Sequence, residues 1–351
     1  MKKTVLNFLN LAVFFASAIS ISCNNEISES PEDSNFWKPQ KGDVYVAGLV
    51  YNSQGHPVAT VWKNGVPQYL SDRICGSEST STVNVFISGS NVYVTGNIEN
   101  TQGDIIPILW KNGVEQSLTD GTREAVANSV YVSGSDAFVA GFVENTQGSY
   151  VATLWKNGTI QFLTDETCWS MANSVFVSGN NVYVAGLADN VQGNHVATLW
   201  KNGEVQYFTN GTDSSNEYES VFVYGSDVYV TGREYSEQGH SVAKLWKNGI
   251  AQYLTDGMRL SETYSVFIYS NDVYVTGHEG SVATLWKNGV AQYFGDGIAL
   301  SVYVSGGDVY VAGVGWSVSN GDVAKLWKNG VEQNLTYEYP HACAYSVFVV
   351  E

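Results

Sequence analysis

Residues 43–70 read DVYVAGLVYNSQGHPVATVWKNGVPQYL, and this stretch decides the fold because each of its parts recurs along the chain. Its runs of β-branched and aromatic residues, such as Asp43 to Gly48, are typical of β-strands. The Asn-Gly pair that follows Trp62 and Lys63 is the strongest short signal for a hairpin. The stretch therefore predicts short antiparallel strands joined by tight turns.

Four elements each occur seven times. Trp-Lys-Asn-Gly begins at Trp62, Trp110, Trp155, Trp200, Trp246, Trp286 and Trp327. The segment before it begins at Asp43, Asn91, Asp136, Asn181, Asp227, Asp272 and Asp308. The segment after it carries Gln68, Gln116, Gln161, Gln206, Gln252, Gln292 and Gln333. Ser-Val-Phe-Val, or a close variant, begins at Asn84, Ser129, Ser174, Ser220, Ser265, Ser301 and Ser346.

Four antiparallel strands in each unit of 40–48 residues predict one blade of a β-propeller. We therefore expect an all-β, seven-bladed propeller over 43–351. We count the Ser-Val-Phe-Val segment as the first strand of each unit and the segment that begins at Asp43 as the second. The domain opens on a second strand at Asp43 and ends on a first strand at Ser346 to Val350, so the C-terminal strand should complete the first blade and close the ring. A closed ring leaves only short, protected sheet edges.

Residues 43–351 resemble the seven-bladed propeller domains of secreted or surface-anchored bacterial lipoproteins. The period is similar to that of WD40 and kelch repeats, but the Trp-Asp and Gly-Gly signatures of those repeats are missing. The Ser-x-Asp-x-Gly-x-x-Trp box of sialidases is missing as well. The resemblance thus implies architecture and location, and it transfers no catalytic residue.

The N-terminus has the features of an export signal. Lys2 and Lys3 precede an apolar stretch from Val5 to Ile21, which predicts a signal peptide over 1–22. Ser22 before Cys23 is similar to a lipoprotein cleavage site, so we expect lipidation of Cys23, with an ordinary secretory signal as the alternative. Residues 23–42 are polar and acidic and should form a flexible tether. The expected location is a bacterial membrane, at the outer membrane or cell surface.

The amino-acid composition limits the kinds of partner and cofactor that the protein is expected to bind. With 34 acidic and 17 basic residues the net charge is −17, which argues against nucleic acid because phosphate binding needs clustered positive charge. Export permits disulfides, and Cys75 and Cys343 flank the first blade, so a disulfide between them could reinforce closure. No spacing of Cys and His suggests zinc. We expect no cofactor, and a monomer.

The spacing between elements separates the two faces of the predicted disc. The turns from strand one to two and from three to four have constant lengths, and the turns from three to four hold the repeated Lys. The other two connections vary in length and share the opposite face, here called the variable face. Length variation confined to one face is typical of a binding face. Unit 6 is short in both connections, which suggests a low rim there, although harmless deletion would give the same pattern.

Residues that the repeat does not require are the candidate binding residues. Three tryptophans lie outside the repeat, at Trp37, Trp169 and Trp316, and each could stack on a sugar or anchor a protein, or simply pack within loops. All four arginines lie in variable connections, where they could recognise an anionic ligand or pair with acids, as Arg123-Glu124 and Arg233-Glu234 suggest. The candidate set is Arg73, Arg123, Trp169, Arg233, Tyr235, Arg259, Tyr264, Trp316 and Tyr345.

Weaker candidates repeat around the ring. The hydroxyls that begin the first strands, from Ser129 to Ser346, should circle the channel mouth, where they could hold a small ligand or satisfy backbone groups. The aspartates Asp72, Asp120, Asp165, Asp256 and Asp296 are interpreted first as turn residues and second as a calcium rim.

The sequence favours a non-enzymatic surface protein that presents its variable face to a glycan or protein partner, with the lipid anchor as its link to the membrane. One alternative is a lyase or hydrolase of acidic polysaccharides, since several of the five histidines could meet on one face and loop carboxylates could form a catalytic pair. Those carboxylates are Glu124, Glu166, Glu219 and Glu262. The other is a rigid scaffold. No catalytic motif selects the enzyme.

Overall fold

The computed structural model describes residues 35–71, 82–206, 216–236, 239–317, 321–336 and 341–351. Over these ranges the chain forms 27 β-strands and no helix. The described ranges thus contain no helix that could span a membrane. Residues 1–34, with the predicted signal peptide and Cys23, lie outside the description.

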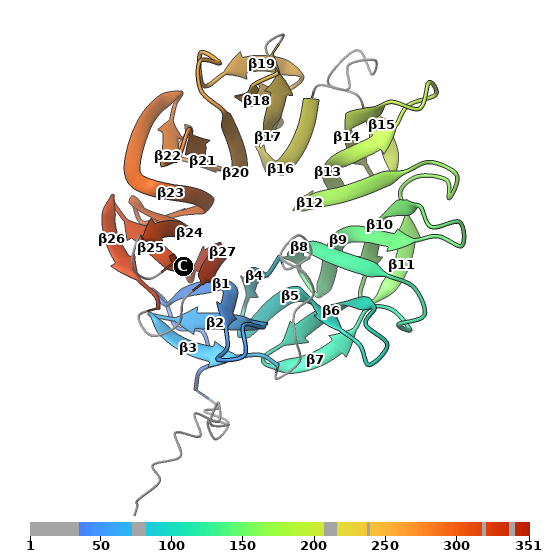
Figure 1. Ribbon diagram of the computed structural model, residues 1–351, viewed down its shortest axis with the longest axis horizontal. Coiled ribbons are helices and arrows are strands. Elements are labelled where there is room, and N and C mark those ends of the chain that lie inside the picture. The colour runs from blue at the N-terminus through green and yellow to red at the C-terminus, as the bar shows by residue number, and fades with distance from the viewer. Residues whose placement is uncertain (1–34, 72–81, 207–215, 237–238, 318–320, 337–340) are drawn as a thin grey trace, which may run out of the picture. The chain divides into compact units, whose positions relative to one another are not determined.

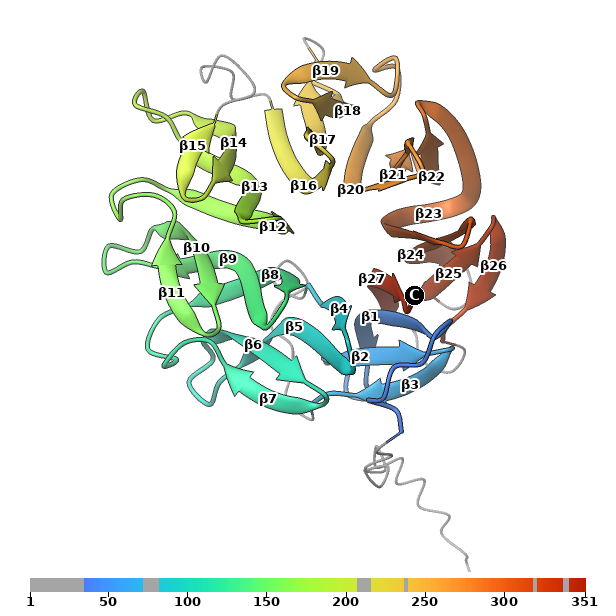
Figure 2. The ribbon, with the colours of Figure 1, turned by 180° about the vertical axis from the view of Figure 1, so that it is seen from behind.

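The strands form antiparallel sheets arranged around a central axis, and the first strand of each sheet lies nearest that axis (Figures 1 and 2). The innermost strands are β27 (Ala342–Val349), β4 (Asn84–Ser88), β8 (Ala125–Ser133), β12 (Ser170–Ser178), β16 (Asn216–Tyr224), β20 (Ser261–Tyr269) and the second half of β23 (Val290–Ser305). The second strands are β1 (Val44–Tyr51), β5 (Asn91–Glu99), β9 (Asp136–Glu144), β13 (Asn181–Asp189), β17 (Asp227–Tyr235), β21 (Asp272–Glu279) and β24 (Asp308–Ser317).

The outer half of each sheet carries the Trp-Lys-Asn-Gly hairpin. The third strands are β2 (Pro57–Lys63), β6 (Ile105–Lys111), β10 (Tyr150–Lys156), β14 (His195–Lys201), β18 (Ser241–Lys247), β22 (Val282–Lys287) and β25 (Gly321–Lys328). The outermost strands are β3 (Val66–Tyr69), β7 (Val114–Ser117), β11 (Thr159–Phe162), β15 (Glu204–Gln206), β19 (Ile250–Tyr253), the first half of β23 and β26 (Val331–Asn334).

This is the predicted seven-bladed propeller, with blade 1 formed by β27, β1, β2 and β3. The C-terminal strand β27 pairs antiparallel with β1, as the order of the chain ends predicts. Beside that pairing, the backbone N–H of Gly42 donates to the carbonyl of Val350 at 2.8 Å. The two ends of the domain therefore meet where every other blade has a turn between its first and second strands.

Blades 6 and 7 differ from the rest because a single strand joins them. The first half of β23 pairs with β22, from Val290 to Asp296, and the second half pairs with β24, from Gly297 to Ser305. Only 15 residues separate Trp286 from Ser301, against 19 or more in the other units. No length remains for a loop, so the outermost strand of blade 6 continues directly into the innermost strand of blade 7.

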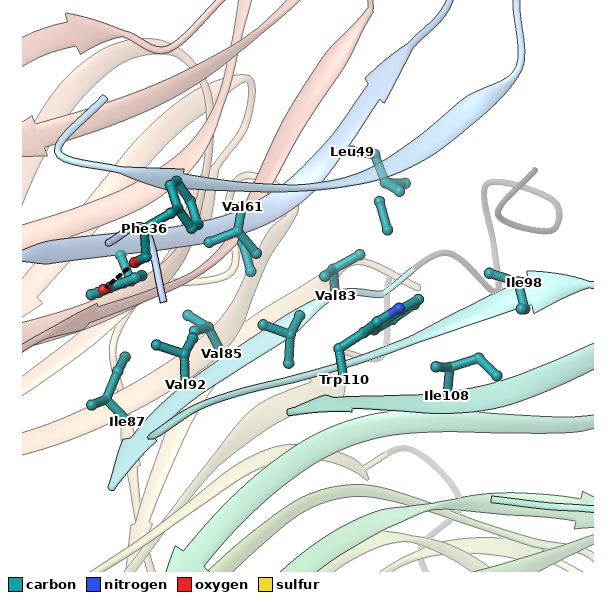
Figure 3. Close-up of a cluster of buried hydrophobic side chains, with 14 of the residues drawn as sticks. Phe36, Leu49, Val61, Val83, Val85, Ile87, Val92, Ile98, Ile108 and Trp110 are labelled. Carbon is teal, nitrogen blue, oxygen red and sulfur yellow. Dashed lines mark hydrogen bonds between the residues drawn. The ribbon is translucent and has the colours of Figure 1, made fainter. Parts of the chain in front are cut away.

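The repeated tryptophans form the cores between neighbouring blades. All seven are at most 1% exposed, so the interpretation of this position as core is confirmed. Trp110, for example, lies among aliphatic side chains of β4, β5 and β6, including Ile98 and Ile108 (Figure 3). Each repeat therefore contributes one large, fully buried aromatic side chain to an inter-blade core.

The other residues of Trp-Lys-Asn-Gly build the constant turn. Asn157 adopts a φ of 51° and Gly158 one of 79°, the left-handed values that a two-residue hairpin requires. The side chain of Asn157 accepts from the N–H of Ala137 at 2.9 Å and donates to Asp136 at 2.8 Å. Lys156 pairs with the same aspartate at 2.8 Å. The repeat thus encodes a hairpin that hydrogen bonds and an ion pair connect to the start of the second strand.

Residues 35–42, expected to form the end of the tether, lie against the propeller. Phe36 is 8% exposed within the core between blades 1 and 2 (Figure 3), and its carbonyl accepts from the hydroxyl of Tyr45 at 2.9 Å. Trp37 lies against the backbone of Gly113, in the constant turn of blade 2. The compact unit accordingly begins at Asn35.

Candidate functional site

A β-bulge in the innermost strand of six of the seven blades places one residue of each at the mouth of the central channel. In blade 3 the register between β8 and β9 shifts between Ala127 and Ser129, so Asn128 is the extra residue. A Cβ on Gly141 of β9 would overlap the carbonyl of Val126, so the glycine of the VYVAG-type segment makes room for the bulge. The same shift occurs in blades 1, 4, 5, 6 and 7.

The residues at this position line a cavity of about 190 Å³. We call it the channel-mouth cavity, and its variable lining consists of Val83, Asn128, Asn173, Glu219, Tyr264, Leu300 and Tyr345. Allowing about 30 Å³ per water molecule, it has space for about six waters. It therefore fits one small polar unit rather than an extended ligand, since pockets for larger molecules start near ~300 Å³.

The neighbouring ring of hydroxyls has a structural role. The N–H of Val175 donates to Ser129 Oγ at 3.3 Å, and the N–H of Val221 donates to Ser174 Oγ at 3.2 Å. Each bond joins the innermost strands of adjacent blades. The serine column is constant because it links blades, and the column just before it is free to vary.

A second ring lies two residues further along each innermost strand, toward the constant turns. Its aromatic side chains contact one another around the whole axis, with centroids 4.6–5.1 Å apart. The members of this aromatic collar are Phe86, Tyr131, Phe176, Phe222, Phe267, Tyr303 and Phe348. Burial raises the pKa of both Tyr131 and Tyr303. The channel is thus polar at its mouth and apolar below.

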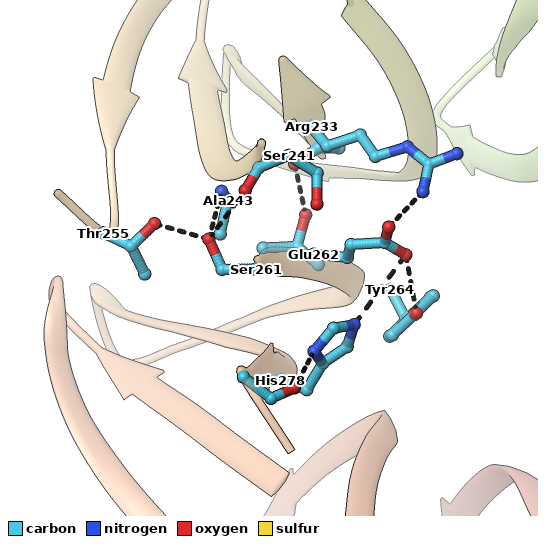
Figure 4. A network of polar contacts seen from close by, with 11 residues as sticks. Arg233, Ser241, Ala243, Thr255, Ser261, Glu262, Tyr264 and His278 are labelled. Atoms are coloured by element: carbon cyan, nitrogen blue, oxygen red, sulfur yellow. Dashed lines mark hydrogen bonds and ion pairs between the residues drawn. The ribbon is translucent and has the colours of Figure 1, made fainter. Parts of the chain in front are cut away.

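A charged network borders the channel-mouth cavity at the seam between blades 5 and 6 (Figure 4). Arg233 of β17 forms an ion pair with Glu262 of β20, whose carboxylate also accepts from the hydroxyl of Tyr264 at 2.9 Å. His278 Nε2 lies 3.9 Å from the same carboxylate, and its Nδ1 lies 2.9 Å from the carbonyl of Gly280. Tyr264 belongs to both the network and the cavity lining.

Burial and the contacts of this network shift two pKa values in opposite directions. Hydrogen bonding from His278, together with the charge of Arg233 and the Tyr264 hydroxyl, outweighs desolvation and lowers the pKa of Glu262 to about 2. Burial, reinforced by the carboxylates of Glu262 and Glu219, raises the pKa of Tyr264. A tyrosine beside a carboxylate is a possible nucleophile–base pair, but these shifts oppose that use, because the base is too weak and the phenol too hard to ionise.

The expected pairing of Arg233 with Glu234 is wrong. Glu234 instead forms an ion pair with Lys244, a largely buried lysine of β18. Successive residues of a strand point to opposite faces of the sheet, so Arg233 reaches blade 6 while Glu234 stays against its own blade. Nothing in the local sequence shows that the true partner, Glu262, lies 29 residues away.

The structure brings only some of the predicted candidates together. Tyr264 and Tyr345 line the channel-mouth cavity, and Tyr235, which is 40% exposed, packs its ring 5.3 Å from the guanidinium of Arg233. The other described candidates are Arg123, Trp169, Arg259 and Trp316, and they belong to separate blades. Arg73 lies outside the described residues.

Two of the five histidines have their own local partners in different blades. His195 lies against Trp169 with ring centroids 4.1 Å apart and contacts Asp189 at 2.5 Å in blade 4, whereas His341 lies 3.6 Å from Asp322 beside blade 7. These two side chains therefore do not share a site.

The turn aspartates hold their own loops. Asp120 accepts from both the N–H and the hydroxyl of Thr122, and these hydrogen bonds lower its pKa. Asp165 is held in the same way by Thr167. Within the described ranges no three His, Cys, Asp or Glu side chains are grouped to hold a metal ion. The turn interpretation therefore applies to these two aspartates.

The cysteines add no reactive group to the cavity. Cys343 of β27 carries a thiol whose pKa burial raises to about 12, so it stays protonated at neutral pH. Its proposed partner Cys75 lies outside the described residues. Cys168, beside Trp169, is likewise a thiol, and desolvation raises its pKa.

Sequence reasoning missed the residue column that lines the cavity, apart from Tyr264 and Tyr345. A signal for it was present, because the position before the repeated Ser differs in chemistry between units while its neighbours hardly change. Recognising that this position faces the channel requires the bulge, which the sequence pattern does not reveal.

Comparison with known proteins gives the fold a structural context. No protein-family model and no curated protein matches the sequence. The chain is similar to an acylaminoacyl peptidase of Pyrococcus horikoshii, with 13% identity, a TM-score of 0.54, and coverage of 86% of this chain and 52% of that one. It is also similar to a puromycin-hydrolyzing peptidase of Mycobacterium tuberculosis, with 10% identity, a TM-score of 0.51, and coverage of 75% and 48%.

A prolyl endopeptidase gives a TM-score of 0.50 at 12% identity, with 90% of this chain and 51% of that one covered. The chain thus spans about half the length of these peptidases. At such identities the likeness supports the β-propeller fold alone, and the same fold serves both enzymatic and binding proteins.

Proposed function

We propose that the chain is an exported, non-enzymatic binding protein that recognises a glycan on its variable face, with one sugar unit seated in the channel-mouth cavity. The observation that carries this proposal is the set of residues at the bulge position, here called the bulge column, which lies directly before the repeated serine in the innermost strands. Six otherwise matching blades present six side chains of mixed chemistry to one small cavity. In blade 2 the corresponding residue, Val83, is instead 1% exposed and belongs to the core between blades 1 and 2. A plain scaffold would not require that column to differ from the serine column beside it.

The lining chemistry favours a sugar. Asn128 and Asn173 supply amides, Glu219 supplies a carboxylate, and Tyr264 and Tyr345 supply aromatic rings with hydroxyls. Amides and carboxylates bind vicinal hydroxyls, while aromatic rings pack on the apolar faces of sugars. The carboxylate and the acidic chain favour a neutral or amino sugar over an acidic one, because a second negative charge near Glu219 would be repelled.

The binding test is a glycan array followed by calorimetric titration of the best ligand. We expect Tyr345→Ala and Asn173→Ala to weaken binding about tenfold or more, equivalent to about 1.4 kcal/mol. Tyr224→Ala is the matched control, on an aromatic at the constant-turn end of β16 that is 42% exposed and absent from the cavity lining, and it should leave affinity unchanged. Unchanged affinity in both cavity variants would refute the channel-mouth site and favour a protein partner elsewhere on the variable face.

A hydrolase remains the second candidate, favoured only by the contact between Tyr264 and Glu262. A screen of polysaccharide hydrolysis and lyase activity with the wild type and Tyr264→Phe tests it. Turnover that Tyr264→Phe abolishes, while the fold is retained, would replace the binding proposal with an enzymatic one.

We also propose that Cys23 carries the lipid anchor. Expression of the full chain in an exporting bacterial host should give a membrane-bound protein, whereas Cys23→Ser should release it into the soluble fraction. Intact-mass measurement of the mature chain checks the added acyl groups. A mature chain that begins elsewhere and carries no lipid would contradict the anchor and leave the sugar-binding proposal untouched.

A further inference from the structure

The constant turns carry an unusual set of exposed aliphatic side chains. Directly after the Asn-Gly pair, five of the seven blades have a Val or Ile that is 62–76% exposed. These residues, here called the aliphatic rim, are Val66, Val114, Ile250, Val290 and Val331. Each opens an outermost strand, and those strands lie around the periphery of the ring (Figure 2). The aliphatic rim therefore follows one edge of the disc on the constant-turn side.

Strand propensity alone does not explain this rim. Threonine fits a strand as well as valine and exposes less apolar surface, and blade 3 has Thr159 at the same position. The aliphatic residue in five blades therefore points to a surface that the rim contacts.

The lysines beside the rim are electrically balanced. Lys63, Lys247 and Lys328 form ion pairs with the aspartates at the start of their neighbouring second strands, at 2.7–2.9 Å. Lys156 and Lys287 are paired in the same way. In a chain of net charge −17, five of the seven constant turns thus match a carboxylate with a cation, while blade 4 carries the exposed Glu204 at the rim position. Carboxylates that are paired with lysines repel an anionic lipid surface less than unpaired carboxylates do.

The chain enters the domain on this same side. Lys63, a constant-turn lysine, donates to the carbonyls of Asn35 at 3.2 Å and Lys38 at 2.9 Å. Trp37 packs on the constant turn of blade 2. Only the eleven residues 24–34 separate Asn35 from Cys23, so they reach at most about 40 Å when fully extended.

We propose that the constant-turn side rests on the lipid surface that holds the anchor, with the aliphatic rim in contact with the headgroup region. The variable face and its channel-mouth cavity then point away from the membrane. This inference rests on the proposed lipid anchor and goes beyond it, because an anchor alone would leave the disc free to tumble. Apolar side chains next to lysines are the combination that proteins use at a membrane interface.

The test uses the full lipid-anchored chain reconstituted in vesicles of phosphatidylethanolamine and phosphatidylglycerol. A photoreactive diazirine amino acid replaces Val114, Val290 or, as the control on the variable side, the exposed Gln192. We expect lipid adducts by mass spectrometry at positions 114 and 290, and background levels at 192. Adducts at 192 alone, or at none of the three positions, would overturn the proposal.

A second variant tests the aliphatic rim itself. In this variant the residues of the aliphatic rim are changed to Thr, and circular dichroism should show that it folds normally. A photoreactive lysine analogue at Lys111, next to position 114, reports lipid contact. We expect several-fold fewer lipid adducts than with the unmodified rim, and equal yields would overturn the role of the rim. Loss of the lipid on Cys23 is detected separately by intact mass, and sugar binding is measured in detergent, so failure here is distinguishable from failure of the binding site.

Discussion

Glu262 shows how a single residue acquires its role from a neighbouring blade. In the sequence it is one of several carboxylates in variable connections. In the structure it receives Arg233 from blade 5, Tyr264 from its own strand and His278 from the next strand. Its side chain is 23% exposed, so water screens these contacts only in part. The carboxylate is therefore better suited to positioning Tyr264 at the channel mouth than to accepting a proton in catalysis.

Replacing Glu262 by Gln should destabilise the fold by about 1–3 kcal/mol near neutral pH, because Arg233 loses its charged partner. The pKa of Glu262 is lowered from 4.5 to about 2 on folding, so the advantage of the wild type is complete above pH 4.5 and is lost as the pH falls toward about 2. Urea unfolding of the wild type and Glu262→Gln across this range measures the difference.

The matched control is Glu279→Gln, since the Glu279 carboxylate accepts a hydrogen bond from the exposed Tyr293 at 2.8 Å. That variant should stay close to the wild type at every pH. A wild-type advantage over Glu262→Gln that does not shrink in acid would contradict the assignment of the network as the source of the pKa shift.

At the scale of the element, the bulge in the innermost strand depends on the glycine that faces it in the second strand. The innermost strand gains an extra residue, and the second strand provides a position without a side chain to accommodate it. The extra residue faces the channel, while the strand otherwise keeps its alternation of buried and solvent-facing positions. In the six blades with the bulge, the fold can therefore vary this residue without disturbing the cores between blades.

Gly141→Ala should cost more than about 3 kcal/mol, because its Cβ would collide with the backbone at Val126, and backbone cannot rotate away as a side chain can. Gly134→Ala in the same blade is the control, with a φ of 60° and no atom within 4 Å of the added Cβ. It should cost about 1–2 kcal/mol, the usual penalty for a left-handed alanine. Thermal unfolding of both variants checks the contrast, and equal losses would disprove the steric account.

At the scale of the whole molecule, the ends of the domain replace one turn of the ring. Val350 donates its N–H to the carbonyl of Asp43 at 2.9 Å, and Gly42 donates to Val350. When the strand pairs β27–β1 and β8–β9 are aligned by their registers, Glu351 corresponds to Gly134 and Gly42 corresponds to Ser135, the two turn residues of blade 3. The ring therefore lacks only one covalent bond at this turn.

A circular permutant tests that view. Changing Glu351→Gly, joining residue 351 to Gly42 and opening the chain beside Gln192 should give a folded propeller with an unchanged circular dichroism spectrum. We expect it to be less stable by about 1.5–3 kcal/mol, because the permutant loses the buried Phe36 of the docked segment. An aggregated or unfolded permutant would show that the ends are not interchangeable with a turn.

By itself, the sequence determined the architecture: seven units of four strands, tight Asn-Gly hairpins, and completion of the first blade by the C-terminal strand. It could do so because strand and turn signals are local, and sevenfold repetition adds weak signals into a strong one. Only the tertiary structure decided the docking of Phe36, the partner of Arg233, the bulge column and the continuous strand β23. These features depend on which side chains of different blades face one another, and residues in contact across a blade seam lie tens of positions apart in the chain.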